Sequence, residues 1–528
     1  MDTKALRQKI LDLAIRGKLV PQDPNDEPAS VLLERIREQK QQMVKDGKLK
    51  KKDIKNDSVI FVGEDNLHYE KFADGSVKCI EDEIPFELPD GWAWARLGTV
   101  AEAIGDGDHQ PPPQTSSGIP FLVISNVSGG ALSFENTRFV SIEYFNRLPE
   151  TRKPRNGDLL FTVTGSYGIP ILVDTDDMFC FQRHIAIVRP CTISNRYLYV
   201  ILGSSYVKSI CDAKATGTAQ KTVGLATLRE LLIPVAPHTE QMRIYAKTQN
   251  ALNIVDGIFS DKEALQNIIK NTKAKILDLA IRGKLVPQDP NDELASVLLE
   301  RIRAEKEELI KQGKIKRDKK ESVIFKGEDN SYYLNDSQIT VDINDELPFK
   351  IPTSWYWVRL KDVFIINPRN KLEDDLNVSF IPMPLIDDGY SGKHTSEVRS
   401  WKEVKTGFTH FAEGDIGIAK ITPCFENRKS TVFINLTNGY GAGTTELHIL
   451  RPIGNSILSQ YLLAYLKSDY FVDNGKQTFT GAVGQQRIGK EYIENAYFPI
   501  PPKSEQERIV QIINNLFKHL NVISDSFF

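Results

Sequence analysis

The stretch ILDLAIRGKLVPQDPNDE occupies residues 10–27, and the same 18 letters occur again at residues 276–293. Other segments follow at nearly the same offset. ASVLLERIR is found at residues 29 and 295, PFELPDGWAWARL at residue 85 resembles PFKIPTSWYWVRL at residue 348, and LLIPVAPHTEQMRI resembles AYFPIPPKSEQERI. Solenoid repeats have periods of about 20–50 residues. A period near 265 therefore predicts two whole structural units joined in tandem.

A seam of apolar residues with alternating spacings of four and three runs through three helical patterns, and this period is typical of coiled coils. The central pattern is interrupted by Lys262 and Thr272. The C-terminal pattern repeats the first half of the central one, and the N-terminal pattern repeats its second half. The seam comprises Leu6, Ile10, Leu13, Ala251, Val255, Ile258, Leu265, Ile269, Ile276, Leu279, Ile509, Ile513, Leu516, Leu520 and Ile523.

These matching registers predict a pseudo-two-fold arrangement. One long central helix, from about Glu240 to Gly283, would pack antiparallel against a helix assembled from both termini. Separate amphipathic helices, each in its own core, remain the alternative. Gly17 and Gly283 stand where C-terminal caps are expected. A second helix should begin near residue 29, capped by Asn25 or Asp26. It should end in a lysine cluster at residues 48–55, which is expected to be a solvated helix end, with phosphate contact as the alternative.

Composition narrows the class of protein. The 528 residues are 41% hydrophobic and 26% charged, with a net charge of −3, as expected for a globular chain of several domains. A protein that coats nucleic acid by charge alone is disfavoured. No apolar run is long enough for a membrane span, the N-terminus does not resemble a signal peptide, and the five cysteines form no CxxC pair. We therefore expect a cytoplasmic protein.

The segments between the repeats are expected to be domains of mixed α/β structure, with short β-rich runs such as DLLFTVTG and glycine-rich turns. They share an outline but few letters, which suggests that the repeated frame binds one kind of partner twice while the inserts bind different targets. The sequence predicts an α+β fold in which two α/β domains are separated by two antiparallel long helices. The predicted parts are the frame at 1–97, an insert at 98–235, the central helix and second frame at 236–360, an insert at 361–500 and a last helix at 501–528.

Catalytic and metal motifs are missing from the sequence. It contains no P-loop, no HExxH and no GxSxG, and its histidines (His109, His184, His410 and His448) are scattered. His184 and His448 fall at similar places in β-rich runs, so structural roles are expected for them. The tetrad at residues 367–370, NPRN, lacks the aromatic residue that would stack a flipped base. We predict no catalytic residue, no metal site and no cofactor in this chain.

The doubled ILDLAIRGKLVPQDPNDE…ASVLLERIR frame, the PF…P..W.W.RL segment and the P….EQ.RI helix start resemble the DNA-specificity subunit of type I restriction–modification enzymes along essentially the whole chain. The resemblance implies two target-recognition domains, 98–235 and 361–500, that each read one half of a split, asymmetric site in double-stranded DNA. It also implies that the frame helices bind two modification subunits, which methylate adenine N6 with S-adenosylmethionine. Restriction subunits that use ATP and Mg²⁺ would join the complex.

Base reading requires side chains with paired donors and acceptors, chiefly Arg or Lys for guanine and Asn or Gln for adenine. Trp92, Trp94, Trp355 and Trp357 alternate at the starts of the inserts and are expected in the core instead. Ordinary surface roles remain the alternative for each candidate. The candidates are Ser166, Tyr167, Gln220, Lys221, Arg369, Asn370, Lys371, Lys420, Gln485, Gln486 and Arg487.

Two other functions stay open at this stage. A fused restriction–modification enzyme would carry cofactor or metal motifs in this chain. A scaffold that binds only proteins would have no affinity for DNA, and an α/β outline does not exclude it.

Overall fold

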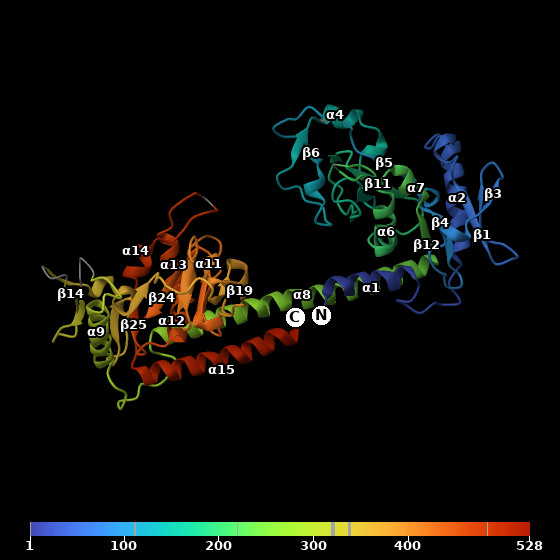
Figure 1. Ribbon diagram of the computed structural model, residues 1–528. Helices are drawn as coiled ribbons and strands as arrows, with labels where there is room; N and C mark the ends of the chain where they lie inside the picture. Colours follow the sequence, from blue (N-terminus) through green and yellow to red (C-terminus); the bar gives the residue numbers. More distant parts are fainter. Residues whose placement is uncertain are drawn as a thin grey trace. The chain divides into compact units, whose positions relative to one another are not determined.

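The computed structural model describes residues 2–109, 112–218, 220–317, 323–335, 339–482 and 484–527. It divides into two compact units, Met1–Asp261 and Lys262–Phe528 (Figure 1). The longest helix, α8 (His238–Ile281), begins in unit 1 and ends in unit 2. The predicted α+β class and the predicted central helix are thus confirmed, with helix ends within two residues of those expected.

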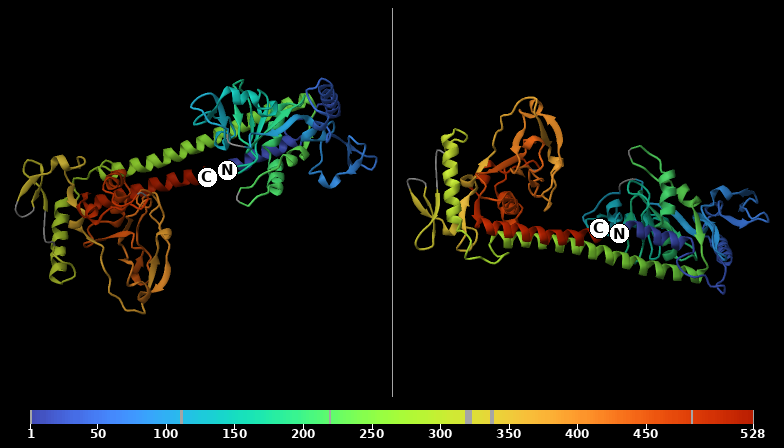
Figure 2. Two further views of the ribbon diagram at one scale, coloured as in Figure 1. Left: turned by 90° about the horizontal axis from the view of Figure 1, so that it is seen from above. Right: turned by 60° about the horizontal axis from the view of Figure 1, so that its bottom comes forward.

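In unit 1, α1 (Thr3–Ile15) runs antiparallel to the first part of α8 (Figures 1 and 2). Arg7 forms an ion pair with Asp256, whereas the chain that follows α1 reaches the beginning of α8. There the side-chain amide of Gln22 donates to Glu240 over 3.2 Å, and Arg243 pairs with Asp26. Contacts between early and late residues in opposite order define the antiparallel packing.

In unit 2, α15 (Lys503–Phe527) packs along the second part of α8 in the same way (Figure 2). The Lys273 ammonium donates to the side-chain oxygen of Asn521 over 2.6 Å. Arg508 holds Asp292 at 2.6 Å, as Arg243 holds Asp26 in unit 1. The repeated PQDPNDE segment therefore makes the same intramolecular contacts twice. Part of its identity is explained by folding rather than by binding.

The frame glycines end their helices as expected. Gly17 and Gly283 have φ values of +65° and +67°, in the left-handed region that glycine adopts without strain. A Cβ atom at either position would lie within 2.4 Å of a proline side chain, Pro89 or Pro352. The helix end and the segment that leads into each inserted domain are thus in direct contact.

The expected cap of the second helix is wrong. Helix α2 (Ala29–Lys45) has Pro28 at its N-cap position and no side-chain cap. The Asp26 carboxylate is instead used by Arg243, and the hydrogen bonds from Arg243 and Thr239 lower its pKa. Its counterpart α9 (Ala295–Lys311) likewise lacks a side-chain cap. The lysines at residues 48–55 are exposed, as expected.

A small three-stranded antiparallel sheet follows each second helix. The sheets precede the segments that carry the paired tryptophans, all four of which are buried as predicted, between 1% and 9% exposed. Trp92 and Trp355 donate their indole N–H groups to Glu240 and Glu505 at 3.0 and 2.9 Å. The strands are β1 (Ser58–Val62), β2 (His68–Phe72) and β3 (Val77–Cys79), and β13 (Val323–Lys326), β14 (Tyr332–Asn335) and β15 (Thr340–Asp342).

Each unit contains a four-stranded antiparallel sheet with the same strand order. The inner strands of both sheets are almost completely buried, because helices cover one face and a second sheet lies beyond the other. In unit 1 the order is β5 (Ala101–Asp106), β11 (Ile185–Pro190), β8 (Leu159–Thr162) and β9 (Pro170–Leu172). In unit 2 it is β17 (Phe364–Ile366), β24 (Leu447–Pro452), β21 (Ile416–Ala419) and β22 (Ser430–Val432).

The second sheets share a core pattern and differ at one edge. Each has a central strand paired parallel on one side and antiparallel on the other, but unit 2 adds one strand, β20. In unit 1 the strands are β10 (Cys180–Phe181), β6 (Ile119–Leu122) and β7 (Arg138–Val140). In unit 2 they are β23 (Tyr440–Gly443), β18 (Asn377–Ile381), β19 (Glu397–Ser400) and β20 (Thr409–Ala412).

Helices and a two-stranded sheet attach each inserted domain to its frame. The Tyr197 and Tyr461 hydroxyls, both fully buried, donate to the carbonyls of Pro234 and Pro499 at 3.0 Å. In unit 1 these elements are β4 (Ala93–Arg96), α3 (Leu97–Val100), α4 (Ile142–Arg147), α5 (Asn195–Leu202), α6 (Ser205–Lys214), α7 (Leu225–Glu230) and β12 (Leu232–Val235). In unit 2 they are β16 (Tyr356–Arg359), α10 (Leu360–Val363), α11 (Trp401–Val404), α12 (Ser459–Leu466), α13 (Asp469–Gln477), α14 (Lys490–Asn495) and β25 (Tyr497–Ile500).

The predicted seam is buried unevenly. The buried members are Ile10, Val255, Ile269, Ile276, Ile509 and Ile513. Half-buried members are Leu6, Leu13, Ala251, Ile258, Leu265, Leu279 and Leu520. Leu516 and Ile523 are exposed, at 38% and 41%. The seam is therefore less buried toward the end of α15 than at its beginning.

Candidate nucleic-acid interface

The four-stranded sheets have one end at which both units are built alike, here called the anchored end. In unit 1 it carries Asp158 and Arg189, joined by two hydrogen bonds of 2.9 and 2.8 Å. In unit 2 Asp415 and Arg451 form the same bidentate pair at 2.8 and 2.7 Å. Burial lowers the pKa of Arg189, but its bonds to Asp158 outweigh this effect and raise it. A buried, paired arginine of this kind is a structural element.

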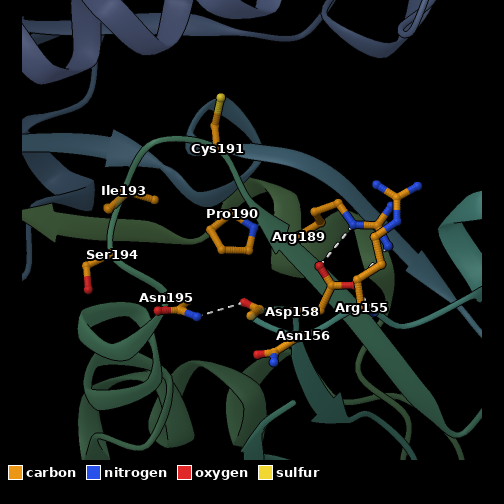
Figure 3. A pocket seen from close by; sticks show the side chains of 10 residues that line it. Arg155, Asn156, Asp158, Arg189, Pro190, Cys191, Ile193, Ser194 and Asn195 are labelled. Atoms are coloured by element: carbon orange, nitrogen blue, oxygen red, sulfur yellow. Dashed lines mark hydrogen bonds and ion pairs between the residues drawn. The ribbon is translucent and has the colours of Figure 1, made fainter. Parts of the chain in front are cut away.

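A hollow of about 340 Å³ lies at the anchored end of unit 1, and polar groups of its lining are already hydrogen-bonded within the chain (Figure 3). Asn195 donates to the Gly157 carbonyl over 3.0 Å, and the Ser194 N–H donates to Gln241 of α8 over 3.0 Å. Equivalent bonds in unit 2 join Ser459 to Gly414 and Leu458 to Gln506. The hollow therefore marks the joint between domain and frame helix. Its lining is Arg155, Asn156, Gly157, Asp158, Arg189, Pro190, Cys191, Ile193, Ser194 and Asn195.

The opposite end of the same sheet, here called the variable end, carries different side chains in the two units. It is formed by Thr164, His184 and Thr222 in unit 1, and by Ile421, Glu446 and Arg487 in unit 2. Asp158 and Thr164 are six residues apart on one extended segment, as are Asp415 and Ile421. Six extended residues span roughly 20 Å. The two ends are therefore well separated.

The backbone of the variable end is the same in both units. Thr164 bridges Thr222 in unit 1, and Ile421 bridges Arg487 in unit 2. Thr222 and Arg487 also exchange backbone hydrogen bonds with a threonine, Thr216 or Thr480, at 2.8–3.1 Å. These bonds make Thr222 and Arg487 structurally equivalent positions. A common backbone with unlike side chains is the arrangement expected where two domains recognise different targets.

The side chains at these positions differ in charge. In unit 1 the Thr164 and Thr222 hydroxyls are hydrogen-bonded to each other at 3.1 Å. In unit 2 Arg487 donates to Glu446 at 2.9 and 3.0 Å and to the Gln485 carbonyl at 3.0 Å. The bonds from Arg487 lower the pKa of Glu446, so the carboxylate is ionised near neutral pH.

Four candidates of unit 1 lie together at the variable end. The Gly165 N–H, next to Ser166, donates to the Lys221 carbonyl over 3.1 Å, which joins the two predicted loops. Ser166, Gln220 and Lys221 are exposed. Tyr167 is already engaged, because its hydroxyl donates to Asp212 at 2.8 Å and the Lys208 ammonium lies 3.9 Å from its ring centroid. Base stacking on that face of the ring would require Lys208 to move.

The candidates of unit 2 fall into two groups. Lys420, Gln485, Gln486 and Arg487 lie at the variable end, where the Ile488 N–H donates to the Lys420 carbonyl and the Thr422 N–H donates to that of Gln486.

The segment with Arg369, Asn370 and Lys371 lies at the anchored end instead. Asn370 accepts from Arg451 at 3.2 Å and donates to the Phe411 carbonyl at 2.9 Å, while Arg369 donates to that of Phe408. Asn370 is therefore committed to intramolecular bonds.

Sequence reasoning did not single out Glu446, and it misaligned two histidines. Because Arg189 and Arg451 occupy equivalent places, His184 corresponds to Glu446, and His448 lies two positions further along its strand. His410 and His448 are buried, and burial lowers the pKa of each. His109 is exposed and paired with Asp106. A local sequence signal could not connect Glu446 with Arg487, which lies 41 residues away.

Within the described ranges, no group of three or more His, Cys, Asp or Glu side chains has an arrangement that could hold a metal ion. Among those same residues, no helix is both long enough and apolar enough to cross a membrane.

Comparison with known proteins shows what this chain is similar to. Residues 352–524 match the family model of the type I restriction modification DNA specificity domain. The chain is 47% identical over 249 residues to the Type I restriction enzyme EcoEI specificity subunit and 49% identical over 243 residues to the EcoAI specificity subunit, both from Escherichia coli. These alignments cover 47% and 46% of this chain, but only 39% and 38% of the relatives.

A solved structure has a similar fold. A chain from a structure of complex assembly and conformational transition of the type I R-M system superposes with a TM-score of 0.52 at 18% identity, over 84% of this chain and 94% of that chain. The match to the DNA specificity domain model lies in unit 2, and the four-stranded sheet of unit 1 has the same strand order as that of unit 2. Over these matched segments the chain is similar to the specificity subunits of type I restriction–modification enzymes.

Proposed function

We propose that this chain is the DNA-reading subunit of a type I restriction–modification complex and that it recognises a split, asymmetric site. The observation that carries the proposal is the pair of variable ends, which present unlike side chains on one backbone. Each inserted domain would read one half of the site. Because the side chains differ, the two half-sites would differ and the whole target would not be a palindrome.

The charge of the inserted domains supports binding shared with partner subunits. Residues 98–235 hold 12 basic and 12 acidic residues, and residues 361–500 hold 15 and 16. Neutral domains gain little from releasing counterions from DNA. Tight binding would therefore need other subunits to surround the duplex, while this chain supplies the sequence preference.

The exposed part of the repeated frame supports two equal docking sites. In both copies of the repeated segment, Gln22, Asp26 and their counterparts bond to other parts of the chain, which explains why they are identical. Other residues that are identical in the two copies are exposed and have no role in the core. Two copies of one modification subunit that methylates adenine N6 would dock on them. These residues are Lys18, Pro21, Asp23, Pro24 and Asn25, with Lys284, Pro287, Asp289, Pro290 and Asn291.

Helix α8 would set the gap between the half-sites. Its 44 residues correspond to about 66 Å at ~1.5 Å per residue. One DNA turn measures ~34 Å. The helix is therefore long enough to act as a spacer of one or more turns. In this proposal S-adenosylmethionine, ATP and Mg²⁺ belong to the modification and restriction subunits, and the assembled complex works in the cytoplasm.

A reconstituted methyl-transfer assay tests the proposal against its two alternatives. Three preparations would receive S-adenosylmethionine and plasmid DNA: this chain, its modification subunit, and the two co-purified. Transfer to one split motif by the co-purified complex alone, with two modification subunits per chain in native mass spectrometry, is expected. Transfer by this chain alone would instead establish a fused enzyme. A stable complex without affinity for DNA would establish a protein-binding scaffold.

A further inference from the structure

One charged pair distinguishes the variable end of unit 2 from that of unit 1. At equivalent backbone positions unit 1 has His184 and Thr222, whereas unit 2 has Glu446 and Arg487. The Arg487 side chain is 41% exposed and Glu446 is 26% exposed, so the pair lies at the surface. The buried Asp158–Arg189 pair of the anchored end, in contrast, is repeated in both units.

The hydrogen bonds of Arg487 leave part of its guanidinium group available. A guanidinium has five N–H donors: one on Nε and two on each terminal nitrogen. Nε and Nη2 each donate to a Glu446 oxygen, and Nη1 donates to the Gln485 carbonyl. Among the described residues, these three bonds leave one N–H on each terminal nitrogen without an assigned acceptor. Two adjacent donors match the O6 and N7 acceptors that guanine presents in the major groove.

We propose that Arg487 reads a guanine in the half-site of unit 2 and that Glu446 is its positioning residue. This inference rests on the proposed function and adds the base and the side chains. Glu446 holds the guanidinium by two bonds, which fixes the direction of the remaining donors before DNA arrives. Preorganisation of this kind reduces the entropy that a long side chain loses on binding. Unit 1 has no arginine at the equivalent position and makes no such contact there.

The same pair argues for a base rather than a phosphate as the ligand of Arg487. A guanidinium held by a carboxylate is electrically neutral as a pair, so it gains little from a phosphate and releases few counterions. The Glu446 carboxylate would also lie close to the phosphate charge and repel it. A guanine edge is uncharged and offers two acceptors, which suits a paired arginine. Lys420 lies at the same end, and its ammonium group is better suited than the paired Arg487 to contact a phosphate.

Two variants and a matched control test the assignment. Arg487→Gln removes the guanidinium, and Glu446→Gln keeps the shape of its support but removes the charge. The control is Arg399→Gln, which breaks another exposed Arg–carboxylate pair, with Glu397 on β19 of the second sheet. Each chain would be assembled with its modification subunits. Binding would be measured on duplexes carrying every base at each motif position, at two salt concentrations.

The assembled wild-type chain is expected to prefer guanine at one position of one half-site by roughly 5- to 150-fold, the range of one bidentate base contact. Arg487→Gln should abolish that preference, Glu446→Gln should weaken it at the same position, and Arg399→Gln should leave it unchanged. Preferences in the other half-site should persist in all variants, which also reports that the complexes are folded. If Arg487→Gln does not assemble, the result for Glu446→Gln decides.

Two outcomes would overturn the inference alone. Unchanged guanine preference in both variants would show that the pair does not read a base. A uniform loss of affinity on all sequences, with a smaller salt dependence, would show that Arg487 contacts a phosphate. A wild-type complex without any sequence preference would overturn the proposed function as well, so the two failures are distinguishable.

Discussion

Lengthening α8 by one heptad should lengthen the gap in the DNA target by about 3 base pairs. Duplicating residues 252–258 inserts LNIVDGI and keeps Val255 and Ile258 in the seam. The inserted copy follows Ile258. It therefore lies between Asp256, which pairs with Arg7 in unit 1, and Lys273, which donates to Asn521 in unit 2, so neither contact is removed. Seven residues add ~10 Å of helix at ~1.5 Å per residue. Along the DNA axis that length equals about 3 base pairs at ~3.4 Å each.

The assay is methylation by the assembled complex of a library in which the two half-sites are separated by gaps of every length. The expected result is a shift of the preferred gap to about 3 base pairs more, with both half-sites unchanged. A seven-residue insertion after Gly313, beyond the end of α9, is the control, because it adds chain without lengthening α8. An α8 insertion that assembles and methylates at the original gap would refute the spacer role.

Three further predictions follow from the two units. Replacing residues 361–500 with residues 98–235 should change the methylated motif to two inverted copies of one half-site, because both domains are anchored by equivalent bonds; a motif that stays asymmetric in sequencing would contradict this. Ile509→Ala should lower the free energy of unfolding of the whole chain in urea by about 2–5 kcal/mol, because this side chain is fully buried, whereas Leu516→Ala, at an exposed seam position, should change it much less. Burial lowers the pKa of Lys467 to about 7. Between about pH 7 and 10.5 this side chain is therefore neutral in the folded protein but still charged in the unfolded chain. The free energy of unfolding should rise with pH across this window by up to ~1.4 kcal/mol per pH unit. Urea titrations of Lys467→Met should show no such rise.

The frame could be predicted because its signals are local and periodic. The apolar seam from Val255 to Leu279 has the period of a coiled-coil helix, and it is long enough to be recognised although Lys262 and Thr272 interrupt it. Gly17 and Gly283 adopt the left-handed conformation, in which glycine commonly ends a helix. The N-cap could not be predicted, because the distant Arg243 competes for Asp26, and an ion pair across 217 residues leaves no local pattern.

The candidate interface was only partly predictable for the same reason. Glycine-led loops identify exposed turns, and these turns do meet at the variable end. The pairing of Arg487 with Glu446 depends on the strand order of the four-stranded sheet, which brings residues 41 positions apart into contact. The side-chain amide of Asn370 has the donor and acceptor of a residue that reads adenine, so the sequence predicts a contact with a base. The fold instead uses them for Arg451 and Phe411.

The most direct test of the whole account is a genome-wide map of N6-methyladenine. Cells that express this chain with its modification subunit would be compared with cells that lack only this chain. The account predicts one split, asymmetric motif with a methylated adenine on each strand, present in the first cells and lost in the second. Methylation that is absent from both, or the same in both, would contradict the claim that this chain selects the DNA target.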